Sequence, residues 1–498
     1  MSKKEKFINE MEKILKDLGA QTRGKKSNKL YVLRKAVHED LTVDGESKQN
    51  FIGFIRAGQA ESGPYAGLSL KVNPGINHYR ISLDIGSLGF GDDYQLAATP
   101  GVKRKFMRLQ KDLMNYAKEK SSGNDAANFP LKCFCAVDFT DDSEKQYLKS
   151  LEAEYVDDKI DSHTQDLFVV MVEKPNFDVM ENKQEWEKEI FWRVFKAVAA
   201  VYAEVRNWPN TRAQKKTATD YLEAICLKKD NTIDEITEVK NLLEKRKYVV
   251  LQGAPGTGKT RLTGKLRSDF SDYVFTQFHA ETSYSDFIGG YQPSVLGDNV
   301  VYRYENGPLL QAIKKAQEKS NEKVLLIIDE INRANLSNVL GEAFYLFEKS
   351  DEDTRAEISL GKQTDGQPEF RIKQLPENLY VVATMNTSDR SLAVVDFALR
   401  RRFMWYTLFP QSLPNNTFHL EQFNKINEIF EMYASSEELL LQPGQSYFIA
   451  DSEEEMKERI EYELLPLIKE YLNLGFLTNA ADHFNQFFIE EIDQTIDL

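Results

Sequence analysis

The order of apolar and polar residues divides the chain into stretches with different patterns. In the first, apolar side chains between residues 5 and 18 recur at helical spacing, which predicts an amphipathic helix. Short apolar runs separated by Gly, Asn, Asp and Pro follow, as is typical of strands joined by turns. These runs read LYVL, FIGFI, GLSLKV, HYRISLDIG, KCFCAVDF and DLFVVMVEK, and a helical stretch at 104–119 precedes the last two. We expect residues 1–175 to form a separate N-terminal α/β domain.

An aromatic-rich helical pattern covers residues 183–206. The polar residues that follow Pro209 have the composition of a linker. We therefore expect residues 176–232 to be a helical connector and linker, with a domain boundary near residue 210.

From residue 233, wholly apolar strands alternate with helices. The expected strands read YVVLQG, YVFTQFH, VLLIIDE and LYVVATMN, and the expected helices cover 233–246, a segment from Gly258, 308–318 and 336–348. Strands that are apolar on both faces and separated by helices are typical of a parallel sheet covered on both sides. After Pro410 the pattern becomes helical and acidic. Residues 233–410 therefore predict a parallel α/β domain, and residues 411–498 predict a small helical domain.

Composition agrees with a folded protein of several domains. The 498 residues exceed what one core supports, and 41% hydrophobic with 29% charged residues excludes the disordered and fibrous classes. No stretch approaches 18 uninterrupted apolar residues, and the first twenty residues lack the apolar segment of a signal peptide. We expect a cytoplasmic protein without membrane contact. The three cysteines lack metal-ligand spacing, and we interpret them as reduced structural thiols.

The net charge of −14 is unevenly distributed. Residues 1–110 carry 19 Lys and Arg against 12 Asp and Glu, so the acidic excess lies in the remainder of the chain. The negative net charge of the whole chain argues against nonspecific coating of DNA. A basic first domain is nevertheless compatible with a local contact to nucleic acid.

One glycine-rich segment has a specific chemical use. GAPGTGKT fits the phosphate-loop pattern G-x-x-x-x-G-K-[ST] and stands between an expected strand and an expected helix. Backbone N–H groups of such a loop converge on phosphate oxygens, Lys259 supplies a positive charge, and Thr260 offers its hydroxyl to Mg²⁺. The alternative is a glycine-rich turn with an exposed lysine. The candidate binding residues are Gly253, Ala254, Pro255, Gly256, Thr257, Gly258, Lys259 and Thr260.

Two carboxylates end the apolar strand VLLIIDE, and the first of them follows Lys259 by 70 positions. Asp329 at the carboxyl end of a parallel strand can coordinate Mg²⁺ through water, and Glu330 can orient or deprotonate an attacking water. Adjacent acids at a strand end can also be merely solvated. Their combination with the phosphate loop favours a nucleotide and metal site.

A further apolar strand ends at Asn386, whose amide is therefore expected beside the two earlier strand ends, within reach of a γ-phosphate or a water. A strand inserted between the two nucleotide-motif strands is characteristic of AAA+ proteins, and an arginine of a neighbouring protomer completes their sites. The candidates for this arginine are Arg333, Arg401 and Arg402. Such a side chain would stabilise charge on the transferring phosphoryl group.

Five segments together resemble the McrB family, the GTP-hydrolysing AAA+ motors of modification-dependent restriction systems. They read GAPGTGKT, QFHAETSYSDFIGGYQP, IIDEINRAN, MNTSDRSLAVVDFALRRRF and GQSYF. The resemblance covers about 233–475 and implies an AAA+ phosphate-loop domain with a C-terminal helical lid. It also implies that Asn386 and Asp389 position the nucleophilic water and that Asp396 braces the arginine run.

The resemblance further assigns Arg333 and either Arg401 or Arg402 to the nucleotide across the subunit interface. Some of the arginines at 390 and 400–402 can instead be internal ion-pair partners or surface charge. The lid shows one departure, because an arginine that often stands shortly before the G-x-SYF turn is missing from LLLQPGQSYF. Gln445 or Ser446 can replace it only in part.

The substrate and partners also follow from the resemblance. It favours GTP with Mg²⁺, whereas the phosphate loop alone does not separate GTP from ATP, and the chain has no N-K-x-D stretch. It implies a ring-forming homo-oligomer, expected to be hexameric, and a separate McrC-like nuclease, since no nuclease motif is evident here. The rival interpretations are an ATP-driven MoxR-type chaperone that remodels proteins and a nucleotide-gated binding module with little turnover.

We expect the first domain to recognise DNA, and such recognition can take a modified base out of the stack. Recognition of a protein or of a phage component is the alternative. Its candidate phosphate contacts are Lys25, Lys26, Lys29, Arg34, Lys35, Lys103, Arg104, Lys105 and Arg108. Its candidate stacking residues, most of which are expected in the core, are Tyr31, Phe54, Tyr65, Tyr79, Phe90 and Tyr94. In the second domain Tyr284, Phe287 and Tyr291 can face a central pore or pack against their own domain.

Overall fold

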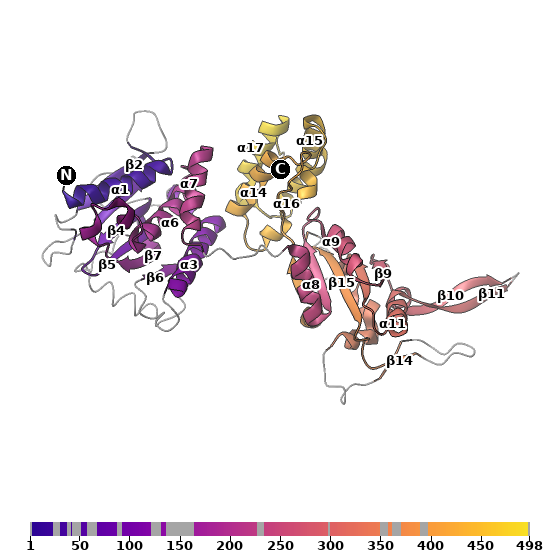
Figure 1. Cartoon of the computed structure of the whole chain (residues 1–498). Helices are drawn as coiled ribbons and strands as arrows, with labels where there is room; N and C mark the ends of the chain where they lie inside the picture. Colours follow the sequence, from indigo (N-terminus) through magenta and orange to yellow (C-terminus); the bar gives the residue numbers. More distant parts are fainter. Residues whose placement is uncertain are drawn as a thin grey trace. The chain divides into compact units, whose positions relative to one another are not determined.

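In the computed structural model, the chain forms two compact units, Met1–Asp230 and Asn231–Leu498 (Figure 1). The structure describes residues 2–22, 30–36, 41, 51–56, 67–86, 92–120, 131–135, 164–226, 234–296, 299–348, 357–360, 370–388 and 397–496. Within these ranges, no helix is long and apolar enough to cross a membrane.

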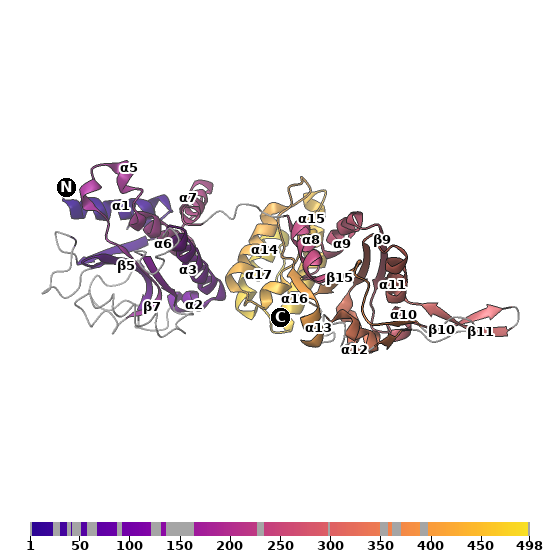
Figure 2. The same ribbon diagram turned by 60° about the horizontal axis from the view of Figure 1, so that its bottom comes forward.

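The first unit is a seven-stranded sheet with helices packed on one face (Figure 2). The strand order is β1-β2-β3-β4-β5-β7-β6, and every neighbouring pair except β1 with β2 is antiparallel. Its strands are β1 Gln21–Thr22, β2 Leu30–Ala36, β3 Phe51–Arg56, β4 Leu68–Pro74, β5 His78–Gly86, β6 Leu131–Cys135 and β7 Thr164–Glu173. Its α-helices are α1 Lys3–Asp17, α2 Asp92–Ala98, α3 Pro100–Lys120, α5 Lys183–Trp186, α6 Ile190–Val205 and α7 Arg212–Glu223.

The two-residue period of the strands separates the faces of this sheet. Phe54 of β3 lies opposite Leu70 of β4, and both are buried on the face that α6 covers, where Phe54 contacts Phe195. The opposite face is also buried but polar, and there Lys71 of β4 forms an ion pair with Asp84 of β5. The two faces of the sheet therefore differ in chemistry, one apolar against α6 and the other polar.

The expected connector at 176–232 is wrong, because α6 is the core helix of the first unit. Phe191 and Phe195 of α6 are fully buried, and Tyr202 donates a hydrogen bond to Phe54 O at 3.1 Å or Leu68 O at 3.2 Å. The polar residues expected to be a linker form helix α7. That helix starts with a capping box at Thr211, and the compact unit continues to Asp230.

The second unit is built on a five-stranded parallel sheet in the order β16-β8-β15-β12-β9. These strands are β8 Tyr248–Gly253, β9 Asp272–Gln277, β12 Val324–Asp329, β15 Leu379–Asn386 and β16 Met404–Thr407. The expected AAA+ arrangement is confirmed, since β15 lies between the strands that carry the phosphate loop and the acid pair. Strand β16 was not expected; its four residues are too few to give a period.

Helices cover both faces of this sheet. The α-helices are α8 Glu235–Arg246, α9 Lys259–Leu266, α10 Tyr284–Phe287, α11 Pro308–Glu318, α12 Leu336–Leu340 and α13 Phe397–Arg402. Apolar side chains of α8 and α9 form one buried cluster with the sheet, and those of α11 and α12 form another. The two-sided burial explains why the strands are continuously apolar.

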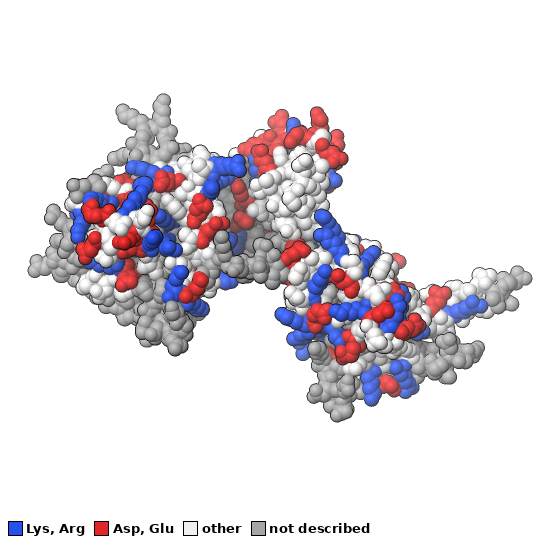
Figure 3. Space-filling view, in the orientation of Figure 1, with Lys and Arg blue, Asp and Glu red and all other residues white. Residues whose placement is uncertain are grey.

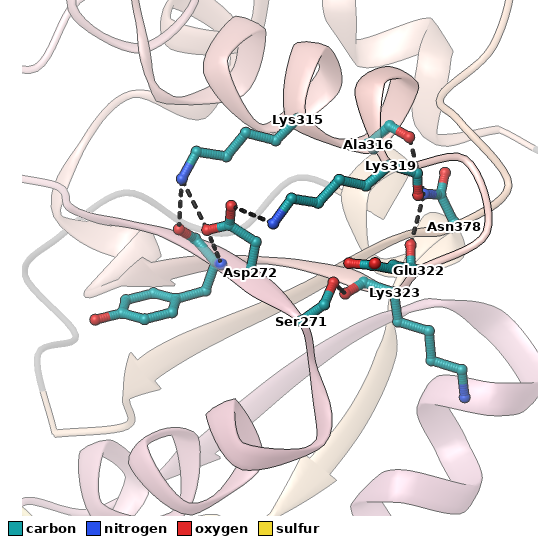
Figure 4. A network of polar contacts seen from close by, with 9 residues as sticks. Ser271, Asp272, Lys315, Ala316, Lys319, Glu322, Lys323 and Asn378 are labelled. Carbon is teal, nitrogen blue, oxygen red and sulfur yellow. Dashed lines mark hydrogen bonds and ion pairs between the residues drawn. The ribbon is translucent and has the colours of Figure 1, made fainter.

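A polar network fixes α11 to the start of the sheet (Figure 4). Lys315 and Lys319 donate hydrogen bonds to Asp272 at the beginning of β9, at 2.8 and 3.0 Å, and they lower the pKa of Asp272 to about 2. Asn378, just before β15, lies 2.7–2.9 Å from three carbonyls at the end of α11 and the turn after it. These contacts lie at the opposite end of the strands from the phosphate loop.

Two elements differ from expectation. The helix expected at 336–348 is α-helical only to Leu340, because Gly341 has a φ of +47° and the chain continues as a 3₁₀-helix to Phe347. A long antiparallel hairpin, β10 Gly289–Leu296 and β11 Asn299–Asn306, extends from the sheet (Figures 1 and 2). This hairpin was not predicted from the sequence, although Tyr302 and Tyr304 alternate with Arg303 and Glu305 in β11.

The C-terminal helices have a core of their own within the second unit. They are α14 Leu420–Tyr433, α15 Glu453–Arg459, α16 Leu465–Asn473 and α17 Ala481–Ile492, with a π-helical turn at Ile460–Leu464. That turn precedes Pro466, which lacks the N–H that a regular α-helix would use. The buried side chains from Phe418 to Ile496 form one cluster, so this part is a helical lid. Its acidic side chains gather around α15 (Figure 3).

Candidate active site

Three strand ends meet at one edge of the parallel sheet. Asn386 at the end of β15 lies opposite Gly253 at the end of β8, and β12 ends beside them at Asp329. The chain stays close beyond the strands, because Thr387 N donates to Gly253 O at 3.1 Å. The sequence motifs predicted at three distant positions are therefore neighbours in space.

The phosphate loop has the backbone that its glycines permit. Gly256 and Gly258 have φ values of +79° and +90°, a region that other residues rarely adopt. A Cβ on Gly253 would lie 2.6 Å from Leu408 O, so this position excludes a side chain as well. Helix α9 then begins at Lys259 with its N-terminus at the loop, where the helix dipole favours anions.

Lys259 is positioned by the loop itself. Its side chain is buried, and Nζ donates hydrogen bonds to Gly253 O at 2.8 Å and Ala254 O at 2.9 Å. Thr257 is also buried and donates to Ala254 O at 2.9 Å, whereas Thr260 in the first turn of α9 is exposed. The ammonium, the helix N-terminus and an accessible hydroxyl form a donor set that fits a phosphate chain with Mg²⁺.

Sequence reasoning missed Thr384, which organises the acid pair. This side chain is 1% exposed, donates to Asp329 Oδ1 at 2.5 Å and accepts from Glu330 N at 3.0 Å. Glu330 has a left-handed backbone, with φ 56° and ψ 48°, which costs about 1 kcal/mol or more for a non-glycine residue. The sequence signal for this role was a hydroxyl in LYVVATMN, two residues before the strand end.

Asn386 contacts the second acid directly. Its Nδ2 donates to Glu330 Oε1 at 2.5 Å, and Asn332 Nδ2 donates in turn to Asn386 O at 3.3 Å. A carboxylate held at a fixed position by an amide is suited to orienting a water molecule. The structure thus brings Glu330 and Asn386 together, as the sequence predicted.

The three candidate arginines differ in accessibility. Arg333 has a side chain 46% exposed, with Nε 3.4 Å from Glu330 Oε2 of the same chain. The side chain of Arg402 is only 7% exposed; it pairs with Glu348 at 2.6 Å and stacks over Phe344. Arg402 is therefore an internal ion-pair partner, the alternative left open by the sequence.

Arg401, in contrast to Arg402, has an exposed side chain. It lines a cavity of about 160 Å³ together with Arg246, Tyr248, Phe347, Glu348 and Arg402. Asp389 and Asp396, assigned to water positioning and arginine bracing, lie outside the described residues, as does Arg390.

Three aromatic residues were expected either to face a central pore or to pack against their own domain. Two of them pack against the domain and one is exposed. Phe287 is 1% exposed and belongs to the core, and Tyr284 packs against Gly341 and donates to Glu342 at 3.2 Å. Burial, reinforced by Glu342, raises the pKa of Tyr284. Tyr291 alone remains available, with 47% of its surface exposed on the hairpin.

Comparison with known proteins finds a matching family model and similar restriction-enzyme components. Residues 248–403 match the family model described as an AAA domain of the dynein-related subfamily. The subunit of the type IV methyl-directed restriction enzyme EcoKMcrB from Escherichia coli K12 is 33% identical over 285 residues, covering 50% of this chain and 60% of that protein. Component YdiS of the type II restriction enzyme BsuMI from Bacillus subtilis 168 is 29% identical over 211 residues, covering 35% of this chain and 60% of that protein.

The similarity thus spans about 60% of the length of these two relatives. An AAA domain uses a nucleoside triphosphate and Mg²⁺, in agreement with the donor set at the strand ends. This region of the chain therefore has the fold and the donor set of a nucleotide-binding AAA domain.

Replacement of Thr384 by valine tests its placement of the acid pair. Valine keeps the shape but removes the hydroxyl between Asp329 and Glu330, so we expect kcat for triphosphate hydrolysis to fall about tenfold, or ~1.4 kcal/mol. Nucleotide affinity in EDTA should stay within about twofold, because the hydroxyl contacts only the acids. Steady-state kinetics and calorimetry give the two values.

The matched control is Thr276→Val on β9, a half-buried strand threonine whose hydroxyl is not among the hydrogen-bond partners of Asp329 and Glu330 described above. Unchanged kcat in Thr384→Val, with Thr276→Val also unchanged, would show that the hydroxyl has no part in placing the acids.

Proposed function

We propose that this McrB-like AAA+ protein is the GTP-hydrolysing motor and DNA-recognition subunit of a restriction complex that acts in antiviral defence. The observation that carries the proposal is the meeting of the phosphate loop, the acid pair and Asn386 at adjacent strand ends. Two relatives are named as restriction-enzyme components, which supports this role over protein remodelling. The proposed substrate is GTP, with ATP as the alternative, and the proposed setting is the cytoplasm.

The described residues account for the chemistry of hydrolysis. Lys259 and the N-terminus of α9 bind the phosphate chain, and Glu330, fixed by Asn386, orients the attacking water. Asp329 and Thr260 would hold Mg²⁺, which neutralises charge on the phosphate oxygens when bound. Asp389 remains part of the proposal as a second residue for the water.

The proposed active form is a hexameric ring in which a neighbouring subunit completes each site. Arg401 is the favoured trans-acting residue, because it is exposed whereas Arg402 is committed to Glu348. Arg333 is the second candidate, although its contact with Glu330 favours a role within one subunit. A separate McrC-like nuclease supplies the cutting activity.

The proposed DNA contact lies on the first unit, through helix α3. Lys103 and Arg108 are exposed there, and Arg108 forms a long ion pair with Asp112 at 4.0 Å. Lys105 is paired with Glu204 at 2.5 Å. Phe54 and Tyr79 are fully buried and therefore cannot stack on a base. On the face seen in Figure 3, basic and acidic side chains of this unit alternate. The remaining candidates, the side chains of Lys25, Lys26, Lys29, Tyr31, Arg34, Lys35, Tyr65, Phe90 and Tyr94, lie outside the described part, and Arg104 is half-buried.

Turnover of GTP and ATP by the purified chain, alone and with the product of a neighbouring nuclease gene, tests the function. We expect faster hydrolysis of GTP and stimulation by the partner. Glu330→Gln should retain nucleotide binding while kcat falls at least about a hundredfold, since the amide cannot act as a base. Hydrolysis of ATP alone, unaffected by any nuclease partner, would favour the remodelling chaperone instead.

Mixing two inactive variants tests the shared site. Arg401→Ala subunits keep Lys259, and Lys259→Ala subunits keep Arg401, so a mixture creates interfaces that hold both residues. At equal amounts, random assembly should restore about a quarter of the parental interfaces if Arg401 acts in trans. The matched control is Arg400→Ala. The guanidinium of Arg400 lies over the ring of Trp405 in the same chain. No recovery at any ratio would assign Arg401 to a role within its own subunit.

Binding of the full chain to methylated, hydroxymethylated and plain duplexes tests the reader. Lys103→Gln and Arg108→Gln should each weaken binding on all duplexes alike and reduce the salt slope by about 1, as expected for phosphate contacts. Lys216→Gln on α7 is a control of equal charge at another exposed position. Fluorescence anisotropy at low salt gives the affinities, and absence of binding to every duplex would end the DNA-reader proposal.

A further inference from the structure

A short turn of the lid lies directly on the phosphate loop. Gly444 N donates to Pro255 O at 2.9 Å, and Ser446 N donates to Gly256 O at 3.2 Å. Between them, the side-chain amide of Gln445 donates to Thr257 O at 2.9 Å. One turn of three residues therefore binds three consecutive carbonyls of the loop.

Those contacts complete the hydrogen bonding of the loop carbonyls. The two preceding carbonyls, of Gly253 and Ala254, accept bonds from Lys259. Every carbonyl from 253 to 257 is thus bound, the first two by the lysine and the next three by the lid. Removal of the lid turn would therefore take the protein partners away from three of these five carbonyls.

The orientation of the carbonyls also fixes the orientation of the amides. In a trans peptide the C=O of one residue and the N–H of the next point in opposite directions. With the carbonyls of Pro255, Gly256 and Thr257 turned towards the lid, the following N–H groups face away from it. Convergent N–H groups are what a phosphate-binding loop requires.

The surroundings of two glycines show how closely the lid turn approaches the phosphate loop. A Cβ on Gly444 would lie 2.0 Å from Gly256 C and 2.2 Å from Thr257 N. A Cβ on Gly256 would lie 2.2 Å from Ser446 Oγ. Because neither position has room for a side chain, the two backbones are in direct contact.

Other residues of the lid hold this turn in place. Gln445 is 8% exposed, and its Oε1 accepts from Gln411 N at 3.4 Å. Arg459, at the end of α15, donates to Ser446 O at 2.9 Å. Movement of the lid helices would therefore move the turn and release the loop carbonyls.

We propose that Gln445 is a positioning residue, and that the turn Gly444–Ser446 holds the phosphate loop in its anion-binding conformation. Lid position then sets the affinity for the phosphate chain, whichever base is attached. The proposal deepens the proposed function and rests on it. It also gives the missing lid arginine a physical account, because a neutral amide supports the loop without contacting the nucleotide.

The test replaces Gln445 by leucine in the full chain and measures calorimetric affinity for GTP, ATP and inorganic tripolyphosphate. Leucine removes the donor to Thr257 O while preserving most of the volume. We expect all three ligands to bind about tenfold more weakly, by the same factor, because the loss acts through the loop. Thermal unfolding of each variant is followed in parallel.

Gln442→Leu is the matched control. This amide is also buried in the lid, three residues away, but its Nε2 donates to Asn427 Oδ1 within the lid at 2.9 Å. We expect it to change thermal stability by a similar amount while all three affinities stay within about twofold of the parent. A merely structural role for Gln445 would make the two variants behave alike.

A second variant, Gln445→Glu, keeps the test decisive if leucine prevents folding. The ionised carboxylate repels Thr257 O, whereas the protonated acid donates to it as glutamine does. Because position 445 is buried, we expect the pKa of a glutamate there to lie above its ordinary value. The ratio of variant to parental Kd should therefore fall as the pH is lowered from about 8 to about 5.

The outcomes separate this inference from the proposed function. Equal affinities in parent and Gln445→Leu, or a loss for GTP and ATP without a loss for tripolyphosphate, would overturn it; the second result would place Gln445 at the base. A parent that binds none of the three ligands would overturn the proposed function and the inference together.

Discussion

The whole site depends on one topological constraint, the insertion of β15 between β8 and β12 in a parallel sheet. Parallel neighbours end at the same edge, so the phosphate loop, the acid pair and the strand-end amide are brought together without any further device. The order also puts Thr384 within hydrogen-bonding distance of Asp329 and Glu330. A change in strand order would separate these groups even if every motif were kept.

Around that edge, the polar side chains are held mainly by one another and by backbone carbonyls. Lys259 is bound to the loop, Glu330 to Asn386, and the loop carbonyls to the lid. Groups fixed before substrate arrives lose little freedom when they bind it, which favours transition-state stabilisation. Arg401 is different, since it is exposed, which suits the trans-acting role proposed for it.

The nucleotide motifs were predictable from the sequence because each combines residue type, spacing and strand context. YVVLQG before the phosphate loop, VLLIIDE and LYVVATMN predicted three strands and the residues at their ends, and the AAA+ resemblance predicted the order of these three. Thr384 was missed because a threonine inside a strand usually reflects β-propensity rather than a role in orienting acids. The state of Arg402 was equally hidden, since its partner Glu348 stands 54 positions earlier. The lid turn was hidden as well, because two of its three contacts with the loop carbonyls come from backbone N–H groups and the third from Gln445, whose residue type does not reveal its partner.

The burial of α6 has a consequence for where the chain can be divided. This helix follows all the strands of its unit in sequence yet fills the centre of their core, so a truncation at residue 175 would separate the sheet from the helix it folds around. Division between α7 and α8 keeps the packing of the first unit intact, because that compact unit extends to Asp230. A fragment that is to fold as the first unit therefore has to include α6 and α7.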